Sequence, residues 1–464
     1  MSDRNRFLGI TVLGDFILSE GVESVLENLQ RVGATAVACN PTVTAPAEEG
    51  TGSFQPPIDA GSSPRVFDRR LFGKTCLWVR SGPSYRPNTA FYKDSPYPPR
   101  RVNDLTETNG DLIGRFIDKA ADSGLKVYLQ IGAAQPSGLR DDDRPRLPNG
   151  QIPAKRMADT ASLASHAVRA YNRAYIRDLL EAYPRISGFR PDWPESPCYT
   201  LGEAFQDFSP HVNQWADLHG FDFEPIQRHV RAFWESLHGA LTTQDLVDFA
   251  GHGRGTFAMI SLLNRVPAVG EWLRLKSALS TDLLREWREV ITEFGGEDRE
   301  LSTNAFMPPY NLVTGLDFAT ASELCDSIAP KLYTMHWSLM VKFWGDELLA
   351  ANPDFDETVL VRALVNLMDL ADSGGGTKIA DYGYPHPDQP HPIPDEPQIR
   401  KIAQVRAAVG DRATVYPLVH GYGPPSDFRR RLQLVADSNA DGVWINRYGY
   451  LGDEKLDAIA AVWR

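Results

Sequence analysis

RFLGITVL at residues 6–13 and ATAVACN at residues 34–40 bound the segment of the chain that decides the fold. Both runs are rich in β-branched and other apolar residues, which is typical of buried strands. Between them, residues 19–32 repeat apolar side chains at helical spacing, and Gly33 ends that helix. A strand–helix–strand unit of this kind predicts parallel strands.

The same alternation continues to the end of the chain. Further strands are expected at residues 125–131, 186–192, 300–306, 328–335, 413–420 and 442–447. Further helices are expected at residues 111–123, 158–183, 272–294, 317–325, 397–409, 426–437 and 453–463. Eight strands are what a closed (β/α)₈ barrel requires. An open doubly wound sheet is the alternative, but no G-x-G-x-x-G follows the first strand and no P-loop occurs. We therefore predict an α/β fold, a (β/α)₈ TIM barrel formed by residues 1–464 as a single domain.

Long insertions follow several of the expected strands. Residues 42–110 are rich in Pro, Gly, Tyr and Arg, and residues 195–270 have a largely helical pattern. Residues 374–397 contain PHPDQPHPIPDEP, which has too many prolines for a helix or a sheet interior. Segments that follow strands emerge at the C-terminal face of a barrel, where active sites are built. We expect 42–110 and 195–270 to be loop excursions that narrow a pocket at that face.

Composition excludes several classes of function. Lys and Arg number 48 and Asp and Glu 60 in 464 residues, so the formal net charge is −12. Such an acidic chain is not expected to bind nucleic acids or anionic membranes, which need basic surfaces. Four cysteines without a C-x-x-C pair argue against a disulfide scaffold or a zinc ribbon. The N-terminus MSDRNR is polar and no stretch of 18 apolar residues occurs, so we expect a soluble, cytoplasmic protein.

The fourth expected strand contains the strongest chemical signal, GFRPDWPE at residues 188–195. Arg190 and Asp192 are two residues apart, so their side chains are expected on the same face of the strand. An Arg beside a carboxylate favours its ionised form, which a nucleophile or a charge stabiliser needs. Glu195 is a second carboxylate nearby, and a drier environment would let it keep its proton as a general acid/base.

This stretch resembles the fourth-strand motif G-F-R-x-D of α-amylase-type barrel glycosidases, in which the Asp is the catalytic nucleophile. It is also similar to the D-W-E-Y strand end of chitinase-type barrels. Residues 127–135 (VYLQIGAAQ), together with DDRPRLPNGQ, SLAS and RPDWPESPCY, resemble an uncharacterised group of bacterial glycoside-hydrolase-like barrel proteins. That similarity covers residues 125–223. It implies a glycoside-hydrolase-like barrel fold without an established substrate, whereas the resemblance to α-amylase-type enzymes implies the nucleophile's place for Asp192.

The sequence departs from these families at the second catalytic residue. Asn304 stands where an amylase-type enzyme has Glu, and His420 is followed by Gly where such an enzyme has His-Asp. The spacing D-x-x-E also differs from the D-x-E of chitinase-type enzymes. The acid/base is therefore not carried over, and Glu195 is assigned by proximity alone. Asp346 and Glu347, in the expected loop after the sixth strand, are the alternatives.

The other expected strand ends are polar and aromatic, a mixture that suits the hydroxyl groups and the apolar faces of sugars. The expected substrate-binding residues are Asn40, Gln130, Arg190, Trp193, Asn304, Tyr333, His336, Trp337, His420, Asn446 and Tyr448. No H-x-H or H-E-x-x-H pair and no nucleotide-binding pattern occurs, so neither a metal nor a cofactor is expected. A metal held by His336, His420 and Asp192 stays as a lesser alternative.

These features together predict a glycoside hydrolase that cleaves a small saccharide or glycoside through Asp192 and Glu195. The expected partner is a small carbohydrate, and the oligomeric state is left open. One alternative is a sugar lyase, aldolase or isomerase that uses Lys331 or a metal. Another is a non-catalytic carbohydrate-binding barrel. Lys331 is unusual inside a strand, and it is expected either to face Asp192 across the barrel or to be a Schiff-base amine. A Lys331 without a carboxylate partner would favour the aldolase.

Overall fold

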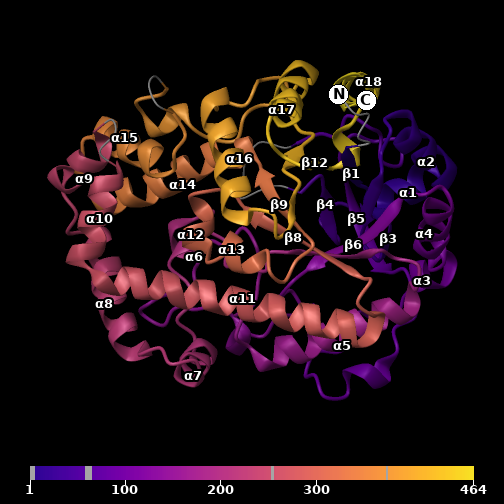
Figure 1. Ribbon diagram of the computed structural model, residues 1–464, viewed down its shortest axis with the longest axis horizontal. Helices are drawn as coiled ribbons and strands as arrows, with labels where there is room; N and C mark the ends of the chain where they lie inside the picture. Colours follow the sequence, from indigo (N-terminus) through magenta and orange to yellow (C-terminus); the bar gives the residue numbers. More distant parts are fainter. Residues whose placement is uncertain (1–5, 58–64, 252–254, 372–374, 464) are drawn as a thin grey trace.

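The chain forms a closed barrel of parallel strands in a computed structural model that describes residues 6–57, 65–251, 255–371 and 375–463 (Figure 1). The strands are β1 (Phe7–Thr11), β2 (Ala36–Cys39), β6 (Lys126–Gly132), β7 (Gly188–Asp192), β8 (Glu300–Phe306), β9 (Ser327–Leu332), β10 (Thr414–Val415), β11 (Leu418–His420) and β12 (Gly442–Asn446). They pair in sequence order, with β10 and β11 forming the seventh barrel strand, and β12 returns to β1. The predicted (β/α)₈ barrel is confirmed.

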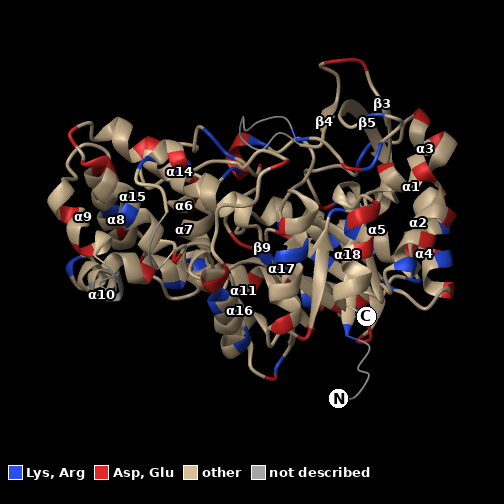
Figure 2. Cartoon of the chain, turned by 90° about the horizontal axis from the view of Figure 1, so that it is seen from above, with Lys and Arg blue, Asp and Glu red and all other residues tan. Residues whose placement is uncertain are grey.

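Helices surround the strands (Figure 1). They are α1 (Gly14–Glu20), α2 (Val22–Arg31), α3 (Asp104–Asn109), α4 (Leu112–Asp122), α5 (His166–Ala182), α6 (Leu201–Ala204), α7 (Pro210–Leu218), α8 (Phe223–Leu237), α9 (Thr243–Ala250), α10 (Gly255–Arg265), α11 (Pro267–Gly295), α12 (Tyr310–Thr314), α13 (Phe318–Ala321), α14 (Thr334–Ala351), α15 (Glu357–Leu367), α16 (Asp395–Val409), α17 (Pro425–Asp437) and α18 (Asp453–Trp463). Acidic and basic residues are interspersed over these helices (Figure 2). None of the helices in the described ranges has the length and apolar composition that a membrane-crossing segment needs.

Side chains fill the barrel interior, as is usual for eight strands. A buried apolar cluster there consists of Ala36, Ala38, Tyr128, Ala329, Leu418 and Trp444. The indole of Trp444 needs the space above Gly9 on the neighbouring strand, because a Cβ at Gly9 would overlap the ring. Small residues on some strands thus make room for the large rings on others.

The two longest insertions have their own secondary structure. After β2, the chain forms a three-stranded antiparallel sheet in the order β3 (Thr42–Pro46), β5 (Leu77–Pro83) and β4 (Ser53–Gln55). After β7, the chain forms helices α6 to α10, as the largely helical pattern predicted. Figure 1 shows α8, α9 and α10 at the left, on the opposite side of the view from α2 and α4.

Several element boundaries differ from the sequence-based expectation, and three of the differences have a clear local cause or consequence. Helix α5 begins at His166 instead of residue 158, because the Ser165 hydroxyl caps the helix by accepting the N–H of Val168. The seventh strand is interrupted at Pro417, which has no N–H to donate. The sixth strand ends at Leu332, and α14 begins two residues later.

Because α14 begins at Thr334, Asp346 and Glu347 lie on this helix. The expectation that they lie in a loop after the sixth strand is therefore wrong.

Candidate functional site

Asp192 ends β7 and forms an ion pair with Lys331, which lies near the end of β9. The Lys331 ammonium is 2.6 Å from an Asp192 carboxylate oxygen, and their side chains are 4% and 21% exposed, respectively. The same ammonium is 4.6 Å from the centre of the Trp193 ring and 5.2 Å from that of Phe306. Lys331 therefore faces Asp192, as one of the two sequence expectations stated, and leaves the carboxylate partly accessible.

Trp193, directly after Asp192, has a left-handed backbone conformation with φ of 51°. A bulky residue in this region costs about 1–3 kcal/mol, and such residues cluster at functional sites. The conformation places the Trp193 ring against the Lys331 ammonium at the point where the chain leaves β7.

Glu195 is fully buried three residues beyond Asp192. One carboxylate oxygen accepts the backbone N–H of Phe306 at 2.7 Å, and the other accepts the hydroxyl of Thr314. Burial raises the pKa of Glu195 to about 7, and the charge of Lys331 opposes that rise. The dry environment expected for Glu195 is present, and both of its oxygens are used to join the segments after β7 and β8.

Arg190 does not pair with Asp192, so the expected ion pair between them is wrong. Its guanidinium donates to Gln130 Oε1 at 3.1 Å, Asn304 Oδ1 at 2.7 Å and Thr11 Oγ1 at 3.3 Å.

The Arg190 guanidinium also lies 3.7 Å from the centre of the Trp444 ring. Burial lowers the pKa of Arg190 to about 10. Side chains two residues apart on a strand point the same way but occupy different layers of the barrel, about 6.6 Å apart. Arg190 therefore binds Gln130 and Asn304 in the layer below Asp192, so its guanidinium links these three expected substrate-binding residues.

Several other expected residues meet around Tyr333, which follows β9. The Asn446 side chain donates to the Tyr333 hydroxyl at 2.7 Å. The Tyr333 ring is 5.0 Å from that of His420 and 5.5 Å from that of His336. Burial raises the pKa of Tyr333, and so does the negative charge of Asp192. The carboxyl ends of β7, β9, β11 and β12 therefore contribute to one group of side chains.

Four expected residues lie elsewhere. Trp337 packs near Lys401 of α16, 5.4 Å from ring centre to ammonium. The Tyr448 hydroxyl donates to Glu20 of α1 at 2.8 Å. Asp346 and Glu347 pair with Lys342 and His238, at 2.9 and 3.0 Å. Both acids are more than ten residues along α14, or about 18 Å from its start.

Two charged residues at the site were missed in the sequence. Asp15 lies in the first turn of α1, just after β1, and burial raises its pKa to about 6, against the charge of Arg447. Arg447 directly follows β12. Asn40, at the end of β2, accepts the backbone N–H of Gly14 at 2.8 Å and so fixes the start of α1. Asp15 is the second residue after the first predicted strand and Arg447 is the last residue of the eighth, so the charged residues at the predicted strand ends were the available signal.

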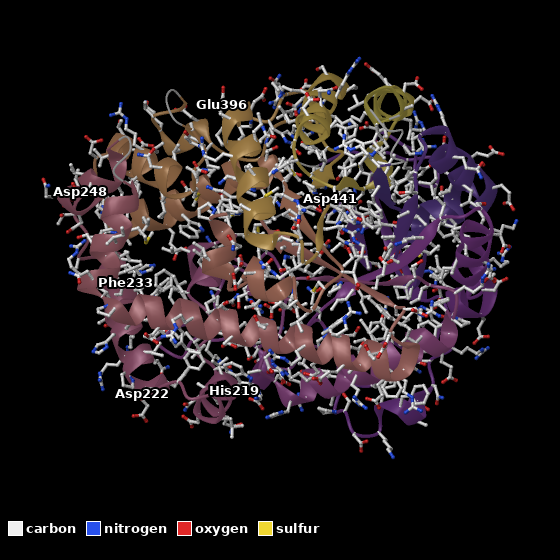
Figure 3. All side chains as sticks on the ribbon, in the orientation of Figure 1. His219, Asp222, Phe233, Asp248, Glu396 and Asp441 are labelled. Atoms are coloured by element: carbon white, nitrogen blue, oxygen red, sulfur yellow. The ribbon has the colours of Figure 1, made fainter. Side chains whose placement is uncertain are left out.

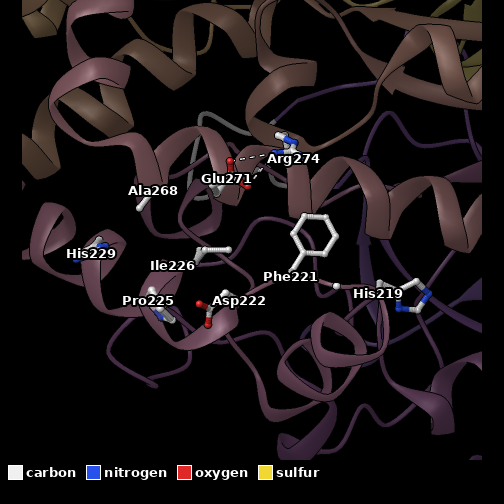
Figure 4. A pocket seen from close by; sticks show the side chains of 10 residues that line it. His219, Phe221, Asp222, Pro225, Ile226, His229, Ala268, Glu271 and Arg274 are labelled. Atoms are coloured by element: carbon white, nitrogen blue, oxygen red, sulfur yellow. Dashed lines mark hydrogen bonds and ion pairs between the residues drawn. The ribbon is translucent and has the colours of Figure 1, made fainter.

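No group of three or more His, Cys, Asp or Glu side chains suited to a metal occurs in the described ranges. A surface pocket of about 490 Å³ lies between the α7–α8 connection and α11, lined by residues that include His219, Asp222, Glu271 and Arg274 (Figure 4). Figure 3 shows His219 and Asp222 below the strands, near α7. None of the residues lining this pocket is at a strand end, so it is separate from the site around Asp192.

No family model and no curated protein sequence matches this chain. Solved structures are similar in fold. A beta-galactosidase from the psychrophilic Marinomonas ef1 matches with a TM-score of 0.52 and 10% identity over 98% of this chain, which spans 59% of that protein's length. The catalytic domain of a beta-amylase from Paenibacillus polymyxa matches with a TM-score of 0.48 and 9% identity, over 98% of this chain and 97% of that one. At these identities, the similarity to the galactosidase shows the barrel fold alone.

Proposed function

We propose that this protein is a glycoside hydrolase that cleaves a small saccharide or glycoside, with Asp192 as the reacting carboxylate. The observation that carries the proposal is the Lys331–Asp192 ion pair at the carboxyl ends of β7 and β9, beside the strained Trp193. In a barrel these strand ends are where catalytic groups are found. The fold similarity to a beta-galactosidase agrees with this proposal.

Asp192 is suited to attack or stabilise a positively charged sugar centre. An oxocarbenium-like transition state needs a carboxylate at a defined place, as nucleophile or as counter-charge. The buried ammonium of Lys331 holds one oxygen of Asp192, while the partly exposed side chain leaves room for approach by a substrate.

Glu195 is proposed as the general acid/base. A pKa of about 7 lets the carboxyl group hold a proton near neutral pH and give it to a leaving oxygen. Since Phe306 and Thr314 occupy its two oxygens, the acid role requires substrate binding to free one of them.

We also propose that residues 1–464 form a single barrel domain in which the two long insertions form the rim of this site. Arg65, from the insertion after β2, donates to the Tyr384 hydroxyl at 3.0 Å, and its charge lowers the pKa of His420. Tyr199, from the insertion after β7, packs 5.3 Å from the ring of His336. The rings of Tyr384 and His336 are 5.8 Å apart, so both insertions reach the same group of side chains.

The test is a screen of p-nitrophenyl glycosides, with Asp192→Asn and a matched surface control, Asp457→Asn. Asp457 is exposed and pairs with Arg31 at 2.6 Å, so its substitution removes an equal charge far from the site. We expect Asp192→Asn to lower kcat at least about a thousandfold on any substrate found, with a thermal midpoint lowered by no more than about 3 °C, because the buried Lys331 ammonium loses its partner. The Asp457 variant should keep full activity. Near-normal turnover by Asp192→Asn would refute the assignment.

Glu195→Gln tests the acid role separately. Substrates with poor leaving groups should lose the most activity, because they depend on proton donation, whereas activated aryl glycosides should lose less. Equal losses on both kinds of substrate would contradict the assignment of Glu195.

A sugar lyase or aldolase is the second candidate, because Lys331 is a buried amine at a strand end. An aldolase would be favoured if Lys331 had no carboxylate partner. Since Asp192 lies 2.6 Å from the ammonium, the hydrolase is favoured. Borohydride reduction in the presence of aldose and ketose sugars, followed by peptide mass analysis, separates the two. The hydrolase leaves Lys331 unmodified, and an aldolase gives a reduced adduct at that residue.

A further inference from the structure

Arg447 has an unusual environment for a charged side chain at the end of a barrel strand. It is partly buried and directly follows β12. Within the described ranges of the chain, its guanidinium forms neither a hydrogen bond nor an ion pair. A guanidinium that is partly withdrawn from water usually has an anionic partner. Its five N–H donors are therefore available for a ligand.

Arg447 directly follows Asn446, whose side chain donates to the Tyr333 hydroxyl at 2.7 Å, so it leaves β12 beside the same group of side chains as Asp192. Both charges affect the Tyr333 hydroxyl, in opposite directions. Arg447 also lowers the pKa of His420, whose ring lies 5.0 Å from that of Tyr333. The guanidinium and the Asp192 carboxylate therefore act on a shared group of side chains from the ends of different strands.

Positive charge is in excess around this group. Asp192 is paired with Lys331, and Asp15 accepts the N–H of its neighbour Phe16 at 3.0 Å. No ion pair joins Asp15 and Arg447 in the described residues. Burial and the charges of both Arg65 and Arg447 keep the pKa of His420 well below its usual range, so that histidine is neutral at pH 7. Arg447 lowers the pKa of Asp15, so a carboxylate lies within the range of its charge, but the N–H donors of Arg447 stay available for an anionic group of the ligand.

We propose that the site recognises a sugar that carries an anionic group, and that Arg447 binds this group. This names the substrate class of the proposed hydrolase and rests on that proposal for the location of the site. A guanidinium matches the planar carboxylate of a uronic acid and the oxygens of a sugar phosphate, in both cases by paired N–H···O contacts. Asp192 would then face the glycosidic carbon while Arg447 fixes the charged substituent.

Calorimetric titration of the wild-type protein with monosaccharides tests the proposal without any need for turnover. The probes are glucuronate, galacturonate and glucose 6-phosphate, each against its neutral parent, glucose or galactose. We expect at least one anionic sugar to bind about tenfold or more tightly than its parent. The uronates and the phosphate ester are separate arms, and the arm that binds more tightly identifies the anionic group.

Arg447→Met should abolish this preference for the anionic sugar and change the affinity for the neutral parent less than about twofold. Arg447→Lys should keep part of the preference, because it retains the charge without the planar fork. Arg274→Met is the control, since Arg274 is an exposed arginine on α11 that pairs with Glu271. Equal affinity for anionic and neutral sugars would overturn the proposal. An equal loss of both affinities in Arg447→Met would also overturn it, because a purely structural role predicts that loss.

Turnover measurements separate this inference from the proposed function. Hydrolysis of aryl glycosides that depends on Asp192 but shows no preference for aryl uronides would refute the anionic substrate alone. Binding of an anionic sugar through Arg447 without hydrolysis of any aryl glycoside or uronide would refute the hydrolase and leave the anion-binding site in place.

Discussion

Replacement of Lys331 by Met tests whether the ion pair organises the site. The substitution keeps much of the side-chain volume but removes the ammonium from beside Asp192, Trp193 and Phe306. Two unit charges 2.6 Å apart attract each other by about 6 kcal/mol at an effective dielectric constant of about 20. Desolvation of the ammonium offsets part of this attraction, so we expect a net loss of about 3 kcal/mol when one partner is removed.

The loss can be measured as a shift in the thermal midpoint. Unfolding entropy of about 2.1 cal/mol/K per residue gives roughly 1 kcal/mol/K for a chain of 464 residues. Lys331→Met should therefore lower the midpoint by about 3 °C. The double variant Lys331→Met/Asp192→Asn should recover most of this loss, because neither charge is then left without its partner.

The exposed pair Lys342–Asp346, 2.9 Å apart on α14, provides a matched control. The same substitutions there should show a coupling of less than about 0.5 kcal/mol, since water screens the pair. A coupling for Lys331–Asp192 no larger than that of the surface pair would refute the reasoning. So would an unchanged midpoint in Lys331→Met.

Glu195 should make the stability depend on pH. Its pKa of about 7 in the folded protein lies above its usual value of 4.5, so the stability of the wild type relative to Glu195→Gln is greatest below pH 4.5. This stability difference should fall by about 3 kcal/mol as the pH rises from 4.5 through 7. Urea unfolding of both proteins measures it, and a difference in unfolding free energy that does not change with pH would exclude a buried carboxyl group with a raised pKa. Gly9→Ala should lower the thermal midpoint by about 1–3 °C or prevent folding, because the new Cβ overlaps the Trp444 ring, and an unchanged midpoint would show that the ring can move aside. Tyr333→Phe should cost about 1 kcal/mol, because the Asn446 amide loses its acceptor, and a loss of less than about 0.3 kcal/mol would mean that water replaces the hydroxyl.

The fold could be predicted from the sequence because it depends on local patterns. Each strand of the barrel is a short apolar run and each helix repeats its apolar residues every three to four positions, so neighbouring residues carry the signal. The limits of residues 300–306 as a strand agree with β8, and the last helix agrees with α18. The predicted boundaries were wrong where a side chain caps a helix, as at Ser165, or where a proline lacks the N–H that a strand needs, as at Pro417.

The sequence by itself determined which polar residues follow the strands, including Asp192 and Glu195, but not which of them meet. Alternation along a strand places Arg190 and Asp192 on one face, yet the barrel separates them into layers, and only the closed sheet shows what lies beside each. Lys331, far away in the chain, reaches Asp192 because β7 and β9 both end at the same face. That Arg447 has no ion-pair partner among the described residues is likewise a property of the assembled strand ends. Partner choice and burial depend on side chains that are distant in the sequence, so only the tertiary structure decided them.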